Sequence, residues 1–152
     1  MRIITTFAII IFITSCKSII LEPADFAWPI ESVLNVNKDG QITDNRYSFS
    51  INVIPLFEAE SKDSADISME TVRIIRGEKG FYYMVAPGFK NLYIFTVYNG
   101  QMTLQNQILI SETGIELPAL NQRKPLIEIL DGERHLFYVN NEGIKENPSE
   151  NK

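Results

Sequence analysis

The feature that most constrains the fold is a series of short β-prone runs separated by turns that contain glycine. In Arg46–Ile54, every second residue is apolar: Tyr47, Phe49, Ile51 and Val53. Such alternation is typical of a strand with one buried face. Asn99-Gly100 separates two further runs, and this dipeptide is the strongest short signal for a β-hairpin. The chain is therefore expected to form antiparallel strands.

Three hairpins follow from this pattern. The predicted strand pairs and their turns are Met69–Arg76 with Phe81–Ala86 around Gly77–Gly80, Asn91–Tyr98 with Gln101–Ile110 around Asn99-Gly100, and Leu126–Leu130 with Arg134–Val139 around Asp131–Glu133. Asn141–Gly143 predicts one more turn, and the acidic, serine-rich Glu58–Ser68 is interpreted as a loop or a short helix. The prediction is an all-β fold, an antiparallel sandwich or barrel of about 7–9 short strands.

Charge and composition exclude some functions. The net charge is −5, and the basic residues are scattered rather than clustered. Nucleic-acid binding needs clustered Lys and Arg, so no nucleic-acid partner is expected. The chain has one cysteine and one histidine, which leaves no thiolate cluster or second imidazole for a zinc site. No cofactor is predicted.

The N-terminal segment has the features of a secretion signal. Arg2 is followed by the apolar run Ile3–Ile13, which is broken only by two threonines. Small residues and the only cysteine, Cys16, come next. A membrane-spanning helix needs about 20 apolar residues, and this run is too short. The segment is interpreted as a signal peptide that is removed from the mature protein.

Ile13-Thr14-Ser15-Cys16 resembles the lipobox of bacterial lipoproteins, although Ile13 and Thr14 depart from the commonest residues. The resemblance covers about the first sixteen residues. It implies cleavage after Ser15 and acyl chains, palmitate among them, on Cys16. Two or three chains anchor a protein firmly, because each buried methylene contributes about 0.8 kcal/mol. Lys17 is not the aspartate that retains some lipoproteins at the inner membrane, so the resemblance favours the outer membrane. An ordinary secretory signal remains the alternative.

The expected organisation is a signal peptide (residues 1–15), a lipidated tether and entry segment (16–30), a β domain (31–144) and a disordered tail (145–152). The entry segment contains Pro23, Pro29 and the only tryptophan, Trp28. Once residues 1–15 are removed, the remainder has the size of one domain.

Two local patterns suggest metal sites but lack essential ligands. Asn35–Arg46 resembles an EF-hand calcium loop, but Asn35 stands at the first position and Arg46 at the twelfth, where calcium requires a bidentate glutamate. We expect an Asp-Gly turn instead. His135 is predicted to share a strand face with Phe137 and Val139, as a core or edge histidine rather than a ligand. No metal site is predicted.

Carboxylates near the predicted turns leave an enzymatic alternative open. Glycosidases use two carboxylates about 5–10 Å apart, and no local motif reveals such a pair. The candidates are Glu112, Glu116, Glu128, Asp131 and Glu133. Solvated loop charge accounts for each of them, so no residue is assigned as catalytic.

Aromatic residues supply the candidates for contact with a partner. Tyr93, Phe95 and Val97 are expected on one face of their strand, which leaves apolar bulk on both faces and is typical of a central strand. Trp28, Tyr82 and Tyr98 are the predicted partner contacts. The sequence favours a membrane-anchored, non-catalytic binding or scaffold module whose partner is an envelope protein or a glycan. A carboxylate-dependent hydrolase and an inhibitor or immunity-type lipoprotein are the alternatives.

Overall fold

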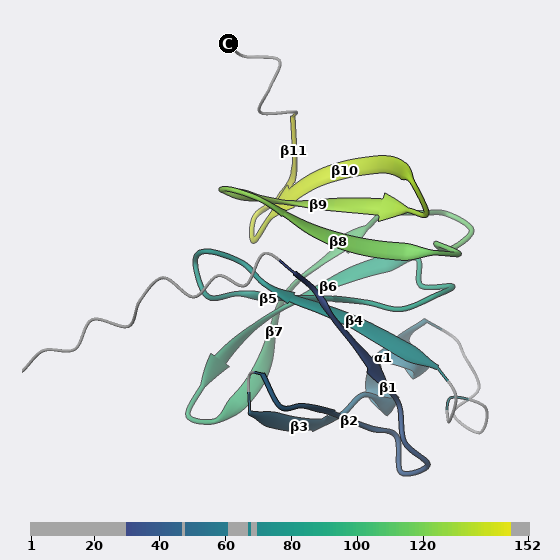
Figure 1. Cartoon of the computed structure of the whole chain (residues 1–152), viewed down its shortest axis with the longest axis vertical. Helices are drawn as coiled ribbons and strands as arrows, with labels where there is room; N and C mark the ends of the chain where they lie inside the picture. The colour runs from purple at the N-terminus through teal and green to yellow at the C-terminus, as the bar shows by residue number, and fades with distance from the viewer. Residues whose placement is uncertain (1–29, 47, 61–66, 68–69, 147–152) are drawn as a thin grey trace, which may run out of the picture.

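A computed structural model describes residues 30–46, 48–60, 67 and 70–146 (Figure 1). These residues form eleven strands and one short helix. The elements are β1 (Ser32–Asn35), β2 (Gln41–Asp44), β3 (Phe49–Asn52), α1 (Ile54–Ala59), β4 (Thr71–Arg76), β5 (Tyr82–Val85), β6 (Asn91–Tyr98), β7 (Gln101–Leu109), β8 (Pro118–Arg123), β9 (Leu126–Asp131), β10 (Arg134–Asn140) and β11 (Gly143–Lys145).

The strands form three layers, and all neighbouring strands are antiparallel. A five-stranded sheet has the order β1-β4-β5-β6-β7, and a four-stranded sheet has the order β11-β10-β9-β8. Figure 1 shows the four-stranded sheet above the five-stranded one, with the β2–β3 pair and α1 below. The predicted all-β antiparallel sandwich is confirmed. The strand count exceeds the expected range because β1, β2, β8 and β11 fall outside the β-prone runs identified in the sequence.

The core lies on both faces of the middle sheet. All four residues of β5 are buried. Tyr82 and Met84 line hollows together with residues of β3 and α1, so they face that layer. Because successive side chains point to opposite faces, Tyr83 and Val85 face the four-stranded sheet. The expectation of a central strand with apolar bulk on both faces is confirmed in β5.

The strand expected over Arg46–Ile54 is shorter than predicted. Arg46 lies in a turn, Ser48 has a left-handed φ of 56°, and β3 begins only at Phe49. Tyr47 lies outside the described residues. Pro55 stands in the first turn of α1, where a missing backbone N–H leaves no helical hydrogen bond unmade. Helix α1 therefore begins soon after β3 ends, and it precedes most of the segment Glu58–Ser68 that was predicted as a loop or a short helix.

The three predicted hairpins are confirmed, with small shifts at their ends. In the Gly77–Gly80 loop, the Gly77 N–H donates to the Phe81 carbonyl at 2.8 Å. Asn99 and Gly100 have φ angles of 49° and 75°, so both have the left-handed backbone of a two-residue type I′ turn. β11 runs through Lys145, the first residue of the predicted tail, and residues 147–152 lie outside the described part.

Candidate functional site

An uncharged groove opens between β3, α1 and the outer part of the β6–β7 hairpin. Two adjoining hollows of about 520 and 360 Å³ share Ile51, Gly100 and Met102, and we call them together the β3–β7 groove. Both volumes fall within the range of about 300–1,000 Å³ that is typical of small-ligand sites. The groove is lined by Ser48, Phe49, Ser50, Ile51, Asn52, Pro55, Leu56, Tyr82, Met84, Phe95, Val97, Gly100, Gln101, Met102 and Leu104.

Strand register brings the apolar lining residues onto one face. Tyr82 of β5 is paired with Phe95 of β6, and Phe95 is paired with Leu104 of β7. Side chains directly opposite in an antiparallel ladder share a face, so these three residues form a row across the sheet. Met102 lies two residues before Leu104 and has the same orientation. The row faces β3 and α1, which close the other side of the groove.

The rim of the groove exposes apolar side chains at the end of the hairpin. Val97 and Leu104 are each 47% exposed, and Tyr98 is 72% exposed. Isolated exposed apolar residues are ordinary, but Val97 and Leu104 both line the apolar hollow. Tyr98 follows Val97 in the strand, so its side chain lies on the opposite face at the tip of the hairpin. This arrangement suits contact with an apolar surface of another molecule.

Two of the residues predicted to contact a partner, Tyr82 and Tyr98, lie in different surroundings. Tyr98 lies at the hairpin tip, directly before the turn. Tyr82 is 8% exposed and forms part of the groove wall, with its ring edge-to-face to Phe49 at 6.1 Å and the Arg76 guanidinium 5.7 Å from its centre. Trp28 and the predicted lipidation site Cys16 lie outside the described residues.

Glu60, just after α1, ties the opposite end of the same hairpin to the helix. Its Oε2 accepts from the backbone N–H of Lys90 at 2.7 Å. Its Oε1 accepts from the Asn91 backbone N–H at 3.2 Å, the Asn91 side-chain amide at 2.8 Å and the Tyr93 hydroxyl at 2.8 Å. We call this arrangement the Glu60 latch. All four donors are satisfied by one carboxylate, which gives it a structural role.

Aromatic packing extends the latch into the core. Phe57, Phe89 and Tyr93 stack edge to face, with ring centres 5.0 and 5.9 Å apart. Burial, together with the hydrogen bond to Glu60 and its negative charge, raises the pKa of the Tyr93 hydroxyl well above its usual range. The hydroxyl therefore remains a donor to Glu60 at physiological pH.

Glu31 joins the two large sheets. One oxygen binds the Arg73 guanidinium on β4, and the other accepts from the Leu120 backbone N–H of β8 at 2.8 Å. Burial raises the pKa of Glu31, although Leu120 and Arg73 both favour its charged form. Ile30 also forms a β-bridge with Asn121. The start of the β domain is thus fixed to both sheets.

The prediction that His135 shares a face with Phe137 and Val139 is wrong. The β9–β10 register shifts between His135 and Phe137, which places His135 opposite Leu130 and Phe137 opposite Ile129. A shift of one residue moves a side chain to the other face of the sheet. His135 therefore lies on the outer face, with 42% of its side chain exposed.

Glu128 is the partner of His135 on this outer face. Glu128 is 7% exposed and lies within β9 rather than near a turn. Its carboxylate is 3.2 Å from His135 Nδ1 and accepts from Arg123 Nε at 2.9 Å. The His135 ring also packs against Tyr138, with ring centres 4.4 Å apart. The residues form a polar cluster on the outside of the sandwich, away from the β3–β7 groove.

The other carboxylates considered at turns are surface or turn-stabilising residues. Asp131 accepts from the Leu117 backbone N–H at 2.9 Å and pairs with Arg134 at 3.3 Å. Glu112, Glu116 and Glu133 are exposed.

The segment that resembles a calcium loop is a turn between β1 and β2. The Asn37 carboxamide oxygen accepts from the backbone N–H groups of Asp39 and Gln41 at 3.0 and 2.8 Å. Gly40 is buried with a φ of 71°, and a Cβ there would lie 2.3 Å from a side-chain carbon of Ile54. The positive φ and the packing against Ile54 both require glycine at position 40. The segment is the Asp-Gly turn expected from the sequence. In the described part of the chain, no three His, Cys, Asp or Glu side chains gather to form a metal site.

Comparison with known proteins gives no match: no family model, no curated protein and no solved structure resembles this chain. Among the residues that the structure describes, no helix has the length and apolar character of a membrane-crossing segment.

Two features of the site could not be read from the sequence. The Glu60 latch joins residues about thirty positions apart, and the groove exists only because β3 and α1 pack beside the hairpin. One feature of the sequence could have indicated the groove: there is no charged residue between Phe95 and Leu109, although 22% of the residues in the chain are charged.

Proposed function

We propose that this protein is a membrane-anchored envelope lipoprotein whose β domain is a non-catalytic binding module. The observation that carries this proposal is the β3–β7 groove with its exposed apolar rim. The partner is a protein of the cell envelope that inserts apolar side chains into the groove. The predicted acyl chains on Cys16 hold the domain at the membrane, the outer membrane being favoured by Lys17.

The charge distribution supports an apolar partner. The chain has a net charge of −5, yet none of the residues that line the groove is charged. Burial of charged groups at an interface is expensive unless they are paired, whereas uncharged apolar walls are desolvated at little cost. Met102, which is only partly buried, adds a flexible side chain that adapts to differently shaped apolar groups.

The polar clusters favour binding over hydrolysis. Glu60 accepts four hydrogen bonds, Glu31 joins Arg73 to Leu120, and Glu128 contacts Arg123 and His135. A carboxylate-dependent hydrolase of the glycosidase type needs two carboxylates that flank one substrate bond. The three carboxylates instead stabilise the helix end, the junction of the sheets and the outer face of β9.

The binding proposal is tested by photo-crosslinking in intact cells. A photoreactive amino acid at Val97, in the groove rim, is expected to capture a defined envelope protein. The matched control carries the same amino acid at Leu117, which is 66% exposed and lies outside the groove lining. A partner captured from Val97 and not from Leu117, and lost when Met102→Glu places a charge in the groove, supports the proposal. Equal capture from both positions contradicts it.

The anchoring proposal needs a separate experiment. Labelled palmitate is expected to be incorporated into the parent chain and to be absent from Cys16→Ser, which should leave the membrane fraction. Unchanged labelling and membrane retention in Cys16→Ser would contradict lipidation at this residue. Because the groove is intact in this variant, the result is independent of partner binding.

A further inference from the structure

The outer edge of β7 has backbone groups available for pairing with another strand. β7 is the last strand of the five-stranded sheet. Tyr98 and Gln101 flank the two-residue turn and so form a hydrogen-bonded pair with each other. Hydrogen-bonded and non-hydrogen-bonded pairs alternate along an antiparallel ladder. The N–H and C=O groups of Met102 and Leu104 consequently point away from β6, toward the open edge.

The usual protection of an edge strand is absent from the first part of β7. Edge strands are normally protected by charged side chains, proline, short length or β-bulges. β7 is nine residues long, Gln101–Leu109, and contains no charged residue and no proline. Its one irregularity is the register shift at Gln105, which has no partner on β6 and lies beyond Leu104. Its first half is mostly exposed. This is the chemistry of a strand that accepts another strand.

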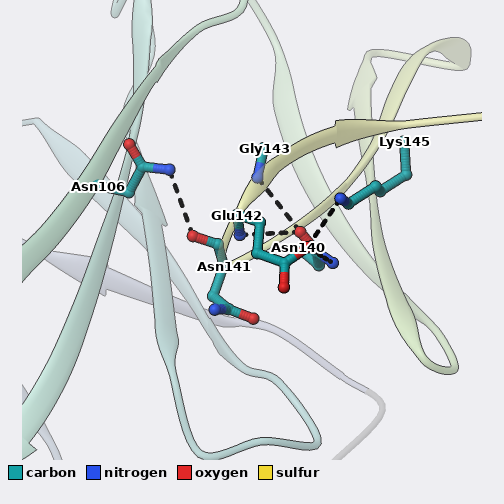
Figure 2. A network of polar contacts seen from close by, with 6 residues as sticks. All are labelled: Asn106, Asn140, Asn141, Glu142, Gly143 and Lys145. Atoms are coloured by element: carbon teal, nitrogen blue, oxygen red, sulfur yellow. Dashed lines mark hydrogen bonds and ion pairs between the residues drawn. The ribbon is translucent and has the colours of Figure 1, made fainter.

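The available window ends at Asn106. Figure 2 shows the Asn106 side chain directed at the turn between β10 and β11, where its Nδ2 donates to the Asn141 carbonyl at 3.3 Å. That turn is held by Asn140, whose side-chain oxygen accepts from the backbone N–H groups of Glu142 and Gly143 at 2.8 and 3.2 Å. The open edge is therefore Gln101–Gln105, with Thr103 at its centre and the unpaired residue of the register shift, Gln105, at its end.

This five-residue window is complementary to itself. A two-fold axis at Thr103 places Met102 of one copy opposite Leu104 of the other, and the reverse. Both residues direct their backbone groups outward, so each such pair exchanges two hydrogen bonds. Their side chains form apolar cross-strand pairs, and the two Thr103 residues face each other. The window is uncharged, so two acidic copies meet there without local repulsion.

We propose that this protein forms a homodimer by antiparallel pairing of β7 with β7 through Gln101–Gln105. The pairing joins two five-stranded sheets into one continuous ten-stranded sheet and brings the two β3–β7 grooves side by side. Its hydrogen bonds use the backbone edge of β7, whereas its cross-strand side-chain pairs use Met102 and Leu104, which also line the groove. Dimerisation and the proposed partner binding therefore share these two side chains, and the backbone variants below test dimerisation alone.

Disulfide trapping in the full chain tests the register. Thr103→Cys places the two sulfurs on residues about 4.5 Å apart between Cα atoms, within disulfide range. Mild oxidation of membranes that contain this variant should give a covalent dimer. The matched control is Gln107→Cys, which is exposed on the same strand but falls far from its counterpart in this register. The parent chain, with Cys16 alone, gives the background. Absence of a Thr103→Cys dimer, or equal trapping from Gln107→Cys, overturns the proposal.

A second pair of variants separates backbone pairing from side-chain contact. Leu104→Pro removes an outward N–H in each copy while keeping the β6–β7 ladder, because proline is tolerated where the N–H faces away from the partner strand. Leu104→Ala removes the side chain alone. Sedimentation of the detergent-solubilised full chain over a concentration series is expected to show dimerisation at least about tenfold weaker in Leu104→Pro than in Leu104→Ala. Equal dissociation constants, or a monomeric parent chain, overturn the proposal.

Discussion

The two halves of the β6–β7 hairpin share one ladder but are stabilised differently. At the base, Leu92, Tyr93 and Ile94 are 0–1% exposed. At the tip, Val97 and Tyr98 are 47% and 72% exposed. The register shift opposite Ile94 and Phe95 divides the two halves. The base is held by segments from elsewhere in the chain, whereas the tip depends on its turn, so the tip is the half that is free to contact other molecules.

The loops beside the base approach each other closely. The Gly88 N–H donates to the Ile115 carbonyl at 2.6 Å, and the Ile115 N–H donates to the Phe89 carbonyl at 3.0 Å. Gly114 has a φ of 96°, and a Cβ there would lie 2.6 Å from the Gly88 carbonyl oxygen. At the tip, a Cβ on Gly100 would meet no atom within 4 Å. The two glycines therefore give a direct comparison of base and tip.

Gly114→Ala is expected to have the largest effect. Backbone overlap adds to the strain of a left-handed alanine, so the free energy of unfolding should fall by roughly 2–5 kcal/mol. Gly100→Ala has the strain alone and should lose about 1–2 kcal/mol. Urea unfolding followed by circular dichroism measures both values. Equal losses would show that the loops at the base are not tightly packed.

Removing the latch carboxylate should have the next largest effect. Glu60→Ala leaves four donors at the base without their acceptor and should reduce the free energy of unfolding by about 2–3 kcal/mol. Glu58→Ala, on the exposed side of the same helix, is the control and should change stability by less than about 0.5 kcal/mol. The same urea titration distinguishes them. A loss as small as that of the control would mean that water replaces the carboxylate without penalty.

The latch should also make stability depend on pH in the alkaline range. The raised pKa of Tyr93 means that the folded state holds this proton more tightly than the unfolded state. The stability that the Tyr93 hydroxyl contributes is fully present below the ordinary tyrosine pKa of about 10, and it is lost as the pH rises above that value. Tyr93→Phe should lose about 1.5 kcal/mol at neutral pH and show a shallower decline above pH 10. Unfolding titrations between pH 8 and 11 test this, and parallel declines in both proteins would contradict it.

A change at the tip should have the smallest effect on stability. Tyr98→Ser is expected to alter the free energy of unfolding by no more than about 0.5 kcal/mol, because Tyr98 is largely exposed. The same variant should reduce capture of the partner from the photoreactive residue at Val97 much less than Met102→Glu does, because the Tyr98 side chain lies on the opposite face of β6 from the groove. Thermal unfolding of the variant, run beside the crosslinking, separates the two effects. A large loss of stability would assign Tyr98 a structural role instead.

Features that depend on neighbouring residues were predictable from the sequence. The Asn99-Gly100 turn and its flanking strands follow from local backbone preferences, and the structure confirms them. Features that depend on contacts between distant parts of the chain were not predictable. The face of His135 was wrong because a register shift between strands leaves no mark in the alternation of residues 134–139. The helix that begins at Ile54 was not predicted after the run Arg46–Ile54, because Pro55 is suited both to the end of a strand and to the first turn of a helix.

The candidate site was only partly foreseen. Tyr82 and Tyr98 were singled out as aromatic residues; the structure places Tyr82 in the wall of the groove and Tyr98 at the hairpin tip, on the opposite strand face from the groove. The contribution of Met102 and Leu104 could not be inferred, since it arises from packing of α1 beside β7. Nor did the sequence indicate that Glu31 joins β4 to β8, because Leu120 lies 89 residues further along the chain.

The position of Glu31 has a mechanical consequence. A pulling force on the segment before residue 30 acts first on the Ile30–Asn121 bridge and on Glu31. Glu31 is bonded to a strand in each large sheet, so tension is shared between the two layers before it reaches β1. A force applied at Ile30 is therefore divided between the two large sheets, and the β6–β7 hairpin lies at the opposite edge of the five-stranded sheet from β1, where that force enters.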